Sequence, residues 1–270
     1  MTTAQGPVLF PGPAGQLACW RSATDSDHGL PVLFLHPINL AGLCWQQVAE
    51  RLAPRRSCWM PDLRGHGASD ARGPYGVEAW ADDCEAILDQ FDMARAHVVG
   101  GSLGGTIAVS LAARLPARVA SIVCIGSTLH TNTEALSPVL AMLAERGVQQ
   151  TFASTLPEIG TAPSASSEVI ERALSLSNPN SVTVVTEIWK AAIATDVRSS
   201  AAEVQCPALA VTGEYDRTCA PEEGAQIARA LGTELVSLPN VGHLPMLENP
   251  DATARTVSAF LAKVEAHDEF

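Results

Sequence analysis

Short apolar runs rich in β-branched residues alternate with longer helical patterns along most of this chain. Six such runs occur, at Val32–Leu35, Ser57–Met60, His97–Val99, Ser121–Ile125, Leu209–Thr212 and Glu234–Leu238. Parallel strands that are covered by helices on both faces are buried on both sides, so they read as continuous apolar runs. The alternation therefore predicts an α/β fold built on a mostly parallel sheet with helices on both faces.

Further elements complete this expected core. Two weaker stretches, near Val8–Phe10 and Gln16–Trp20, flank the sequence PGPAG, which predicts a starting hairpin and brings the sheet to eight strands. Helices are expected around an apolar stripe at residues 80–91, over Thr106–Leu115, and from the prolines that open Pro221–Leu231 and Pro250–Val264.

The alternation stops between Thr128 and Ser200. That stretch contains helix-like pieces separated by the clusters GTAPSASS and LSNPNS. It is too long for a loop in a compact domain, and its apolar residues, such as Leu143, Phe152 and Trp189, argue against a disordered excursion. We expect residues 128–200 to form an inserted helical cap, and residues 1–127 and 201–270 to form the α/β core.

Composition excludes several classes of partner. The chain is 47% hydrophobic, which argues against a mainly disordered protein. Its net charge is −12, so it would repel a phosphate backbone. It has no stripe of Lys or Arg, and we expect no nucleic-acid partner. It also has no run of roughly 18 apolar residues that could span a membrane. The sequence MTTAQGPVLFPGPAG does not resemble a secretory signal, so we expect no membrane partner.

The seven cysteines, at positions 19, 44, 58, 84, 124, 206 and 219, are scattered and show no CxxC spacing. This pattern favours reduced thiols and a cytoplasmic location over a disulfide framework or a zinc site. The chain has no other cluster of metal-ligating residues at ligand spacing, and it lacks a dinucleotide-binding fingerprint. We expect no metal and no cofactor.

The sequence Gly100-Gly101-Ser102-Leu103-Gly104 lies between an expected strand and an expected helix. This is the G-x-S-x-G pattern in the strand–turn–helix context of a nucleophile elbow, in which a sharp turn projects one hydroxyl above the sheet. Residues two positions either side of the serine must lack side chains that would collide. Glycine-rich turns also bind phosphates, but the GxxxxGK[ST] and GxGxxG patterns are both absent. Ser102 is the candidate nucleophile.

An acid and a histidine follow in the order that such a serine requires. Asp216 comes just after the run Leu209–Thr212, and His243 lies in the loop after Glu234–Leu238. His243 would accept the Ser102 proton, and Asp216 would fix the imidazole tautomer and stabilise the imidazolium. Glu214 is close enough in sequence to compete with Asp216.

The expected oxyanion hole consists of backbone N–H groups. Leu103 follows the nucleophile and supplies one donor. The loop His36-Pro37-Ile38-Asn39 should supply the other, and Ile38 is the candidate because proline has no N–H. We interpret His36 as a structural hydrogen-bonding residue of this loop, not as a base.

Five segments together resemble the α/β-hydrolase superfamily over the whole chain apart from the cap. They are FLHP at 34–37, PDLRGHGASD at 61–70, VGGSLGG at 99–105, GEYD at 213–216 and VGHLPMLENP at 241–250. The spacing is most similar to that of 3-oxoadipate enol-lactonases, related small esterases and cofactor-free haloperoxidases. The resemblance implies an α/β-hydrolase fold and architectural roles for Asp62 and Arg64.

Three positions depart from the family patterns. Pro37 replaces the usual glycine of the oxyanion loop. Gly101 stands where esterases often carry His and carbon–carbon bond hydrolases often carry Asn, and Leu244 stands where the latter tend to have Trp. A serine at position 102 argues against haloalkane dehalogenases and epoxide hydrolases, which use an aspartate there.

The leading hypothesis is a serine hydrolase that cleaves a small carboxylic ester or an (enol-)lactone through an acyl-enzyme. The alternatives are a carbon–carbon hydrolase of the β-diketone or meta-cleavage type or a C–N hydrolase with the same triad, and a non-catalytic small-molecule receptor on the same fold. Within the expected cap, Trp189 and Lys190 are candidate substrate-binding residues. One of the bases Lys190, Arg146 and Arg172 could hold a substrate carboxylate, although the simpler interpretation of each is a surface charge. The expected partner is a small-molecule substrate, and the sequence leaves open whether the protein forms a homo-oligomer.

Overall fold

Eight strands form one sheet in the order β1-β2-β4-β3-β5-β6-β7-β8 in the computed structural model, which describes residues 6–22, 29–131 and 133–268. The strands are β1 (Val8–Gly12), β2 (Gly15–Ser22), β3 (Val32–Leu35), β4 (Cys58–Asp62), β5 (Ala96–Gly101), β6 (Val119–Ile125), β7 (Ala208–Gly213) and β8 (Leu235–Leu238). The pairs β1–β2 and β2–β4 are antiparallel, and the other pairs are parallel. The predicted fold class is confirmed. Parts of the expected core (1–5, 23–28 and 269–270) and residue 132 of the expected cap lie outside the described residues.

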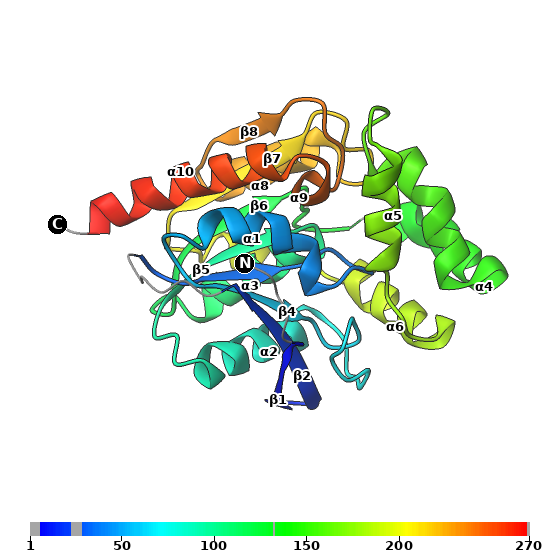
Figure 1. Ribbon diagram of the computed structural model, residues 1–270, viewed down its shortest axis with the longest axis horizontal. Coiled ribbons are helices and arrows are strands. Elements are labelled where there is room, and N and C mark those ends of the chain that lie inside the picture. Colours follow the sequence, from blue (N-terminus) through cyan, green and yellow to red (C-terminus); the bar gives the residue numbers. More distant parts are fainter. Residues whose placement is uncertain (1–5, 23–28, 132, 269–270) are drawn as a thin grey trace.

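Helices cover both faces of this sheet (Figure 1). One face carries α2 (Val77–Gln90), α3 (Leu103–Arg114) and α8 (Pro221–Ala230), and the other carries α1 (Gln46–Leu52), which follows the short turn η1 (Gly42–Trp45), α9 (Pro245–Glu248) and α10 (Pro250–Asp268). Successive residues of a strand point to opposite faces, so Leu33 and Leu35 pack in the first layer while Val32 and Phe34 pack in the second. Each short strand therefore contributes side chains to the apolar layers on both faces of the sheet.

Strand β5 is longer than its apolar run predicted. The run ends at Val99, but the strand continues through Gly100 and Gly101, which pair with Cys124 and Ile125 of β6. Glycine has a low β-propensity, so its backbone hydrogen bonding is invisible to a pattern of side chains. The extension carries the strand directly to Ser102.

A helical segment is inserted between β6 and β7. It contains α4 (Thr133–Thr155), the π-helical turn η2 (Leu156–Gly160), α5 (Ser167–Ser175), α6 (Val182–Ile193) and α7 (Arg198–Ala201). Helix α4 is broken at Gly147, where φ is 78°. In Figure 1, α4, α5 and α6 lie together at one end of the molecule, and the arrows of β7 and β8 point toward that end. We call α4, η2, α5 and α6 the cap helices.

Hydrogen bonds attach the loop between α5 and α6 to a loop of the core. The side-chain amides of Asn178 and Asn180 donate to the carbonyl of Gly65 at 2.7 and 2.9 Å. The chain has returned to the core by Val197 and Ala201, which are buried in the layer that contains α3. The cap helices are thus held over the carboxyl ends of the central strands.

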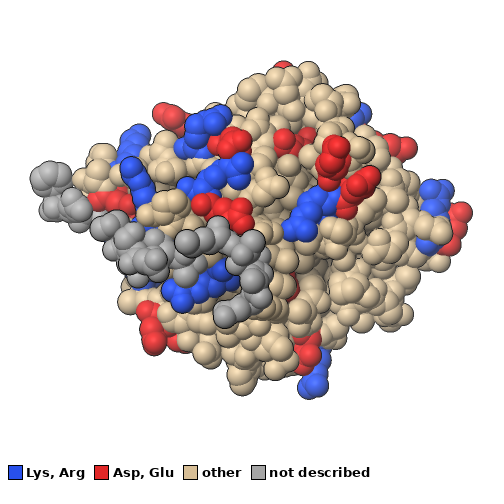
Figure 2. All heavy atoms as spheres, in the orientation of Figure 1, with Lys and Arg blue, Asp and Glu red and all other residues tan. Residues whose placement is uncertain are grey.

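The side chains of Lys and Arg lie among those of Asp and Glu on the face of the molecule shown in Figure 2. No basic stripe is visible on this face, in keeping with the net charge of −12. No helix in the described part of the chain is long and apolar enough to cross a membrane.

The segment PDLRGHGASD forms a buried turn after β4. The Asp62 carboxylate accepts hydrogen bonds from the backbone N–H groups of Gly42 and Ala68 at 2.7 and 2.9 Å. Arg64 makes a bidentate ion pair with Asp83 of α2, and both side chains are at most 5% exposed. Asp62 and Arg64 thus stabilise the turn, which is the architectural role that the family resemblance implied for them.

The buried pair generates a prediction about stability. Asp83→Asn keeps the side-chain shape but leaves the Arg64 charge buried without its carboxylate, which should cost about 3–5 kcal/mol. Asp82 is the matched control, because its carboxylate pairs with Arg114 while 50% exposed. Asp82→Asn should cost at most about 1 kcal/mol. Thermal unfolding of both variants measures the difference, and equal melting temperatures would contradict the role of the buried pair.

Candidate active site

The turn after β5 holds Ser102 in a strained conformation. Ser102 has φ 51° and ψ −120°, and it connects β5 directly to α3. A Cβ on Gly100 would lie 2.2 Å from the carbonyl of Gly104, and a Cβ on Gly104 would lie 2.2 Å from the carbonyl oxygen of Leu35. The expectation that residues two positions from the serine must lack side chains is confirmed. The turn therefore presents the Ser102 hydroxyl at the amino end of α3, where the helix dipole favours negative charge.

The space beside Gly101 explains one departure from the family patterns. A Cβ at this position would lie 2.8 Å from Met246 and 3.1 Å from the indole of Trp45. Both side chains are fully buried. They occupy the volume that a larger residue before the nucleophile would need.

Asp216 and His243 lie in the loops after β7 and β8 and form a hydrogen-bonded pair. Nδ1 of His243 is 2.9 Å and 3.1 Å from the two carboxylate oxygens of Asp216. The backbone N–H groups of Thr218 and Cys219 donate to Oδ1 of Asp216 at 2.9 and 2.8 Å. These bonds fix the carboxylate, which fixes the imidazole and leaves Nε2 available on the other side of the ring.

Glu214 occupies a different environment from Asp216, which lies two residues further along the chain. Its side chain is exposed, and its carboxylate accepts a hydrogen bond from the backbone N–H of Asn240 at 2.9 Å. Asp216 is 3% exposed and contacts His243. The structure thus separates two carboxylates that the sequence left in competition.

The loop that carries His243 is held by Glu248. The Glu248 carboxylate accepts hydrogen bonds from the backbone N–H groups of Gly242 and Leu244, on either side of the histidine, at 3.0 and 3.1 Å. It also accepts one from Ala162 of the inserted segment at 2.7 Å. One carboxylate therefore ties the histidine loop to the insertion that covers it.

Neighbouring carboxylates raise the pKa of His243. Burial by itself lowers the pKa of an imidazole, but the charge and hydrogen bonding of Asp216, together with Glu248 and Glu223, outweigh it. The pKa of Glu223 is itself raised, first by burial, and its side chain bonds to Thr128. His243 thus lies in a negative environment that favours the imidazolium.

A cavity of about 340 Å³ adjoins these groups. Ser102, His243, Ile38 and Leu103 all line it, so both residues expected to form the oxyanion hole border the same cavity as the serine. As the first residue of α3, Leu103 has an N–H with no acceptor inside the helix. The rest of the lining is mostly apolar and includes Leu40, Val139, Phe152, Leu156, Ile159, Trp189, Ile193 and Leu244.

The two candidate substrate-binding residues of α6, Trp189 and Lys190, occupy different environments. Trp189 lines the cavity and also packs against the apolar cluster of Leu143, Val148 and Val185. Lys190 is outside the lining, because its side chain is 57% exposed and its ammonium pairs with Glu187 at 2.9 Å. The expectation that Lys190 contacts substrate finds no support in this geometry. Adjacent residues of a helix point about 100° apart, which is why only one faces inward.

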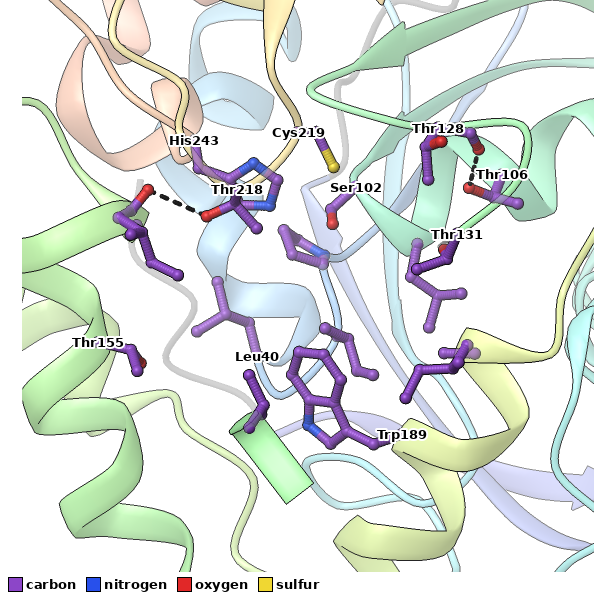
Figure 3. Close-up of a pocket in the computed structure, with 18 of the residues that line it drawn as sticks. Leu40, Ser102, Thr106, Thr128, Thr131, Thr155, Trp189, Thr218, Cys219 and His243 are labelled. Carbon is purple, nitrogen blue, oxygen red and sulfur yellow. Dashed lines mark hydrogen bonds between the residues drawn. The ribbon is translucent and has the colours of Figure 1, made fainter. Parts of the chain in front are cut away.

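The lining residues that the sequence did not indicate include three with titratable or charged side chains beside Asp216 in the chain or on the helix that follows it: Cys219, Glu223 and Arg217. Burial raises the pKa of the Cys219 thiol well above its ordinary value, and the lowering effect of the Ser102 side chain does not offset it, so the thiol stays protonated. Figure 3 shows Cys219, Ser102 and His243 together at one side of the cavity. A lone cysteine or glutamate carries no motif, although closeness in sequence to Asp216 was an available signal.

His36 belongs to the oxyanion loop but does not line the cavity. Its Nδ1 is 2.8 Å from the carbonyl oxygen of Pro37, and its Nε2 accepts a hydrogen bond from the backbone N–H of Leu63 at 3.0 Å. Burial lowers the pKa of His36 to about 4, so the ring is neutral. These bonds agree with the structural role expected for it.

In the described segments, no group of three or more His, Cys, Asp or Glu side chains gathers as a metal site would require. The absence of a cofactor stays a prediction.

Comparison with known proteins identifies the family. The model of the α/β-hydrolase fold family matches residues 31–250, most of the chain. The chain therefore belongs to the α/β-hydrolase fold family, as its motifs and sheet order indicate.

The relatives of the chain include an esterase and a semialdehyde hydrolase. The chain is 29% identical to a pimeloyl-[acyl-carrier protein] methyl ester esterase of Chromobacterium violaceum over 244 residues, 86% of this chain and 94% of the relative. It is 37% identical to a 2-hydroxymuconate semialdehyde hydrolase of Pseudomonas sp. CF600, but over only 108 residues, 38% of each chain. The enol-lactonase from Burkholderia xenovorans LB400 shares the fold, with a TM-score of 0.85 at 23% identity over 94% of this chain and 100% of that one. The predicted likeness to enol-lactonases and small esterases is confirmed.

The acidic surroundings of His243 generate a second prediction. Glu223→Gln removes one of the charges that favour the imidazolium, so the pKa of His243 should fall relative to the unmodified protein. Glu222→Gln is the control, since Glu222 precedes Glu223 on α8 and is exposed. NMR titration of the His243 imidazole measures both. A fall of equal size in the control would rule out a specific effect of Glu223.

Proposed function

We propose that this protein is a serine hydrolase that cleaves a small carboxylic ester or lactone through an acyl-enzyme on Ser102. One observation carries the proposal: the strained Ser102 and the Asp216–His243 pair open onto the same mostly apolar cavity. Strained backbone of this kind persists where the surrounding structure imposes it, and it clusters at active sites. The substrate is a small molecule that fits this cavity.

The first half of the reaction follows from the positions of the groups. His243 takes the Ser102 proton at Nε2 as the oxygen attacks the substrate carbonyl carbon. Negative charge develops on the carbonyl oxygen, where the N–H groups of Leu103 and Ile38 would stabilise it. The imidazolium then protonates the leaving alkoxide, and the acyl group stays on Ser102. For a lactone, the alcohol remains part of the acyl group.

The second half repeats these steps with water. His243 accepts a proton from a water molecule that attacks the acyl-enzyme, and it returns the proton to Ser102 as the carboxylic acid leaves. Asp216 keeps the imidazole in the tautomer with a proton on Nδ1 and stabilises each imidazolium. The apolar lining limits other water near the acyl-enzyme.

The share of each chain that matches favours cleavage of an ester over cleavage of another kind of bond. The methyl ester esterase matches over most of both chains, whereas the 2-hydroxymuconate semialdehyde hydrolase matches over 38% of each. That local match supports carbon–carbon hydrolysis as the second candidate, in which His243 would also move a proton on the substrate. Assays with p-nitrophenyl acetate and a panel of β-diketones separate the two activities. Turnover of neither class would favour a receptor.

The proposed compartment is the cytosol. All seven cysteines are free thiols, and six of them are buried. This usage supports a reducing environment.

Replacement of the nucleophile tests the acyl-enzyme directly. Ser102→Ala should lower kcat for ester hydrolysis by several orders of magnitude, because the remaining groups provide only binding and oxyanion stabilisation. The fold should persist, since the smaller side chain leaves the turn intact. Stopped assays beside a circular dichroism spectrum measure both properties. Activity within tenfold of the unmodified enzyme would exclude Ser102 as nucleophile.

The two carboxylates after β7 provide a matched comparison. Asp216→Asn should lower kcat by about 10⁴-fold, because the amide favours the wrong imidazole tautomer. Glu214→Gln keeps an oxygen acceptor for the backbone N–H of Asn240 and should leave kcat within a few-fold of normal. The reverse ranking of the two variants would assign the acid role to Glu214.

A further inference from the structure

Two buried polar atoms in the cavity lining have no hydrogen-bond partner among the described residues. They are Nε1 of Trp189, on α6, and Oγ1 of Thr151, on α4. Thr151 is 1% exposed. The other buried side-chain atoms without a partner belong to Asn39, His66 and Arg118, which do not line the cavity. The unpartnered atoms of the cavity thus both belong to the cap helices.

An unpaired buried donor is costly, so native proteins pair nearly all such groups. Thr155, one turn further along α4, shows the ordinary arrangement: it also lines the cavity, but its hydroxyl donates to the carbonyl oxygen of Thr151 at 3.0 Å. In the view of Figure 3, Trp189 lies at the opposite side of the cavity from Ser102 and His243. A ligand that is bound at Ser102 and also satisfies Trp189 would therefore reach beyond the reacting carbonyl.

The chemistry of the two groups defines what they bind. An indole nitrogen only donates, and a threonine hydroxyl donates or accepts, so a hydrogen-bond acceptor can satisfy either atom. The basic residues of the cap helices are engaged elsewhere: Lys190 pairs with Glu187, Arg146 with Glu145, and Arg172 donates to Gln46. Arg217, which also lines the cavity, belongs to the loop that carries Asp216 and not to the cap helices. A carboxylate beside the cap helices would therefore lose its hydration without gaining a counter-charge from them. The acceptor is therefore uncharged.

We propose that Trp189 and Thr151 form a subsite for an uncharged oxygen, such as a ketone or amide carbonyl, on the acyl chain of the substrate. This inference rests on the proposed function, because it assumes that the acyl group bound to Ser102 extends toward the cap. The substrate class is accordingly an ester or lactone of an oxo- or amido-substituted acid. Simple alkanoate and dicarboxylate esters lack the matching group.

The test compares p-nitrophenyl heptanoate with its 4-oxo, 5-oxo and 6-oxo analogues and with the half-ester of heptanedioate. The unmodified enzyme should prefer at least one oxo ester over heptanoate in kcat/KM by about two- to tenfold for each hydrogen bond, mainly through KM. Heptanedioate should show no such preference. Thr151→Val, which preserves shape, and Trp189→Phe should each reduce the oxo-to-alkyl ratio toward one.

Thr155→Val is the matched control, because that hydroxyl already has a partner, and its ratio should stay close to that of the unmodified enzyme. A ratio near one in the unmodified enzyme, a ratio unchanged by Thr151→Val and Trp189→Phe, or an equal fall in Thr155→Val would overturn the subsite.

A binding experiment distinguishes failure of the proposed function from failure of the subsite. If the unmodified enzyme hydrolyses none of these esters, calorimetry on the Ser102→Ala variant measures their affinity without chemistry. Tighter binding of an oxo ester that is lost on adding Thr151→Val would support the subsite although hydrolysis had failed. Equal affinity for oxo and alkyl esters would overturn the subsite as well.

Discussion

The close contact between the backbone of α3 and that of the central strands is the constraint on which the rest of the structure depends. Gly104 packs so tightly against the carbonyl of Leu35 that no side chain fits between them, and Gly100 meets Gly104 in the same way. This contact requires the chain to turn within one residue, which places Ser102 at positive φ. The buried parallel strands supply a rigid support for that strain.

Carboxylates then position the groups around the serine. Asp216 is held by two backbone N–H groups and orients His243, while Glu248 holds the backbone on both sides of the histidine and reaches Ala162 in the inserted segment. The same kind of bond, a carboxylate that accepts from backbone N–H groups, therefore arranges both loops and joins one of them to the insertion. The cap helices close the cavity mostly with apolar side chains, and Trp189 and Thr151 carry the buried polar atoms there that have no partner among the described residues.

Much of this could be read from the sequence because it depends on local or periodic features. Buried parallel strands are continuous apolar runs, which predicted six strands, and the turn sequence PGPAG predicted the antiparallel hairpin of β1 and β2. The errors were of a few residues, for example where glycine extends β5. The turn at Ser102 and the loops that carry Asp216 and His243 each follow directly after a strand, and the carboxyl ends of parallel strands meet at one edge of the sheet. Order along the chain was enough to bring these three residues together as candidates.

Only the tertiary structure decided the properties that depend on burial and on contacts between distant segments. It separated the buried Asp216 from the exposed Glu214, although both lie in the same short loop. It directed Trp189 inward and Lys190 outward, because the side that a helix residue presents depends on how the helix packs. It also brought Cys219 beside Ser102 without any motif to announce it. Patterns in the sequence determine which elements form and in what order, whereas packing decides which side chains lose water and meet.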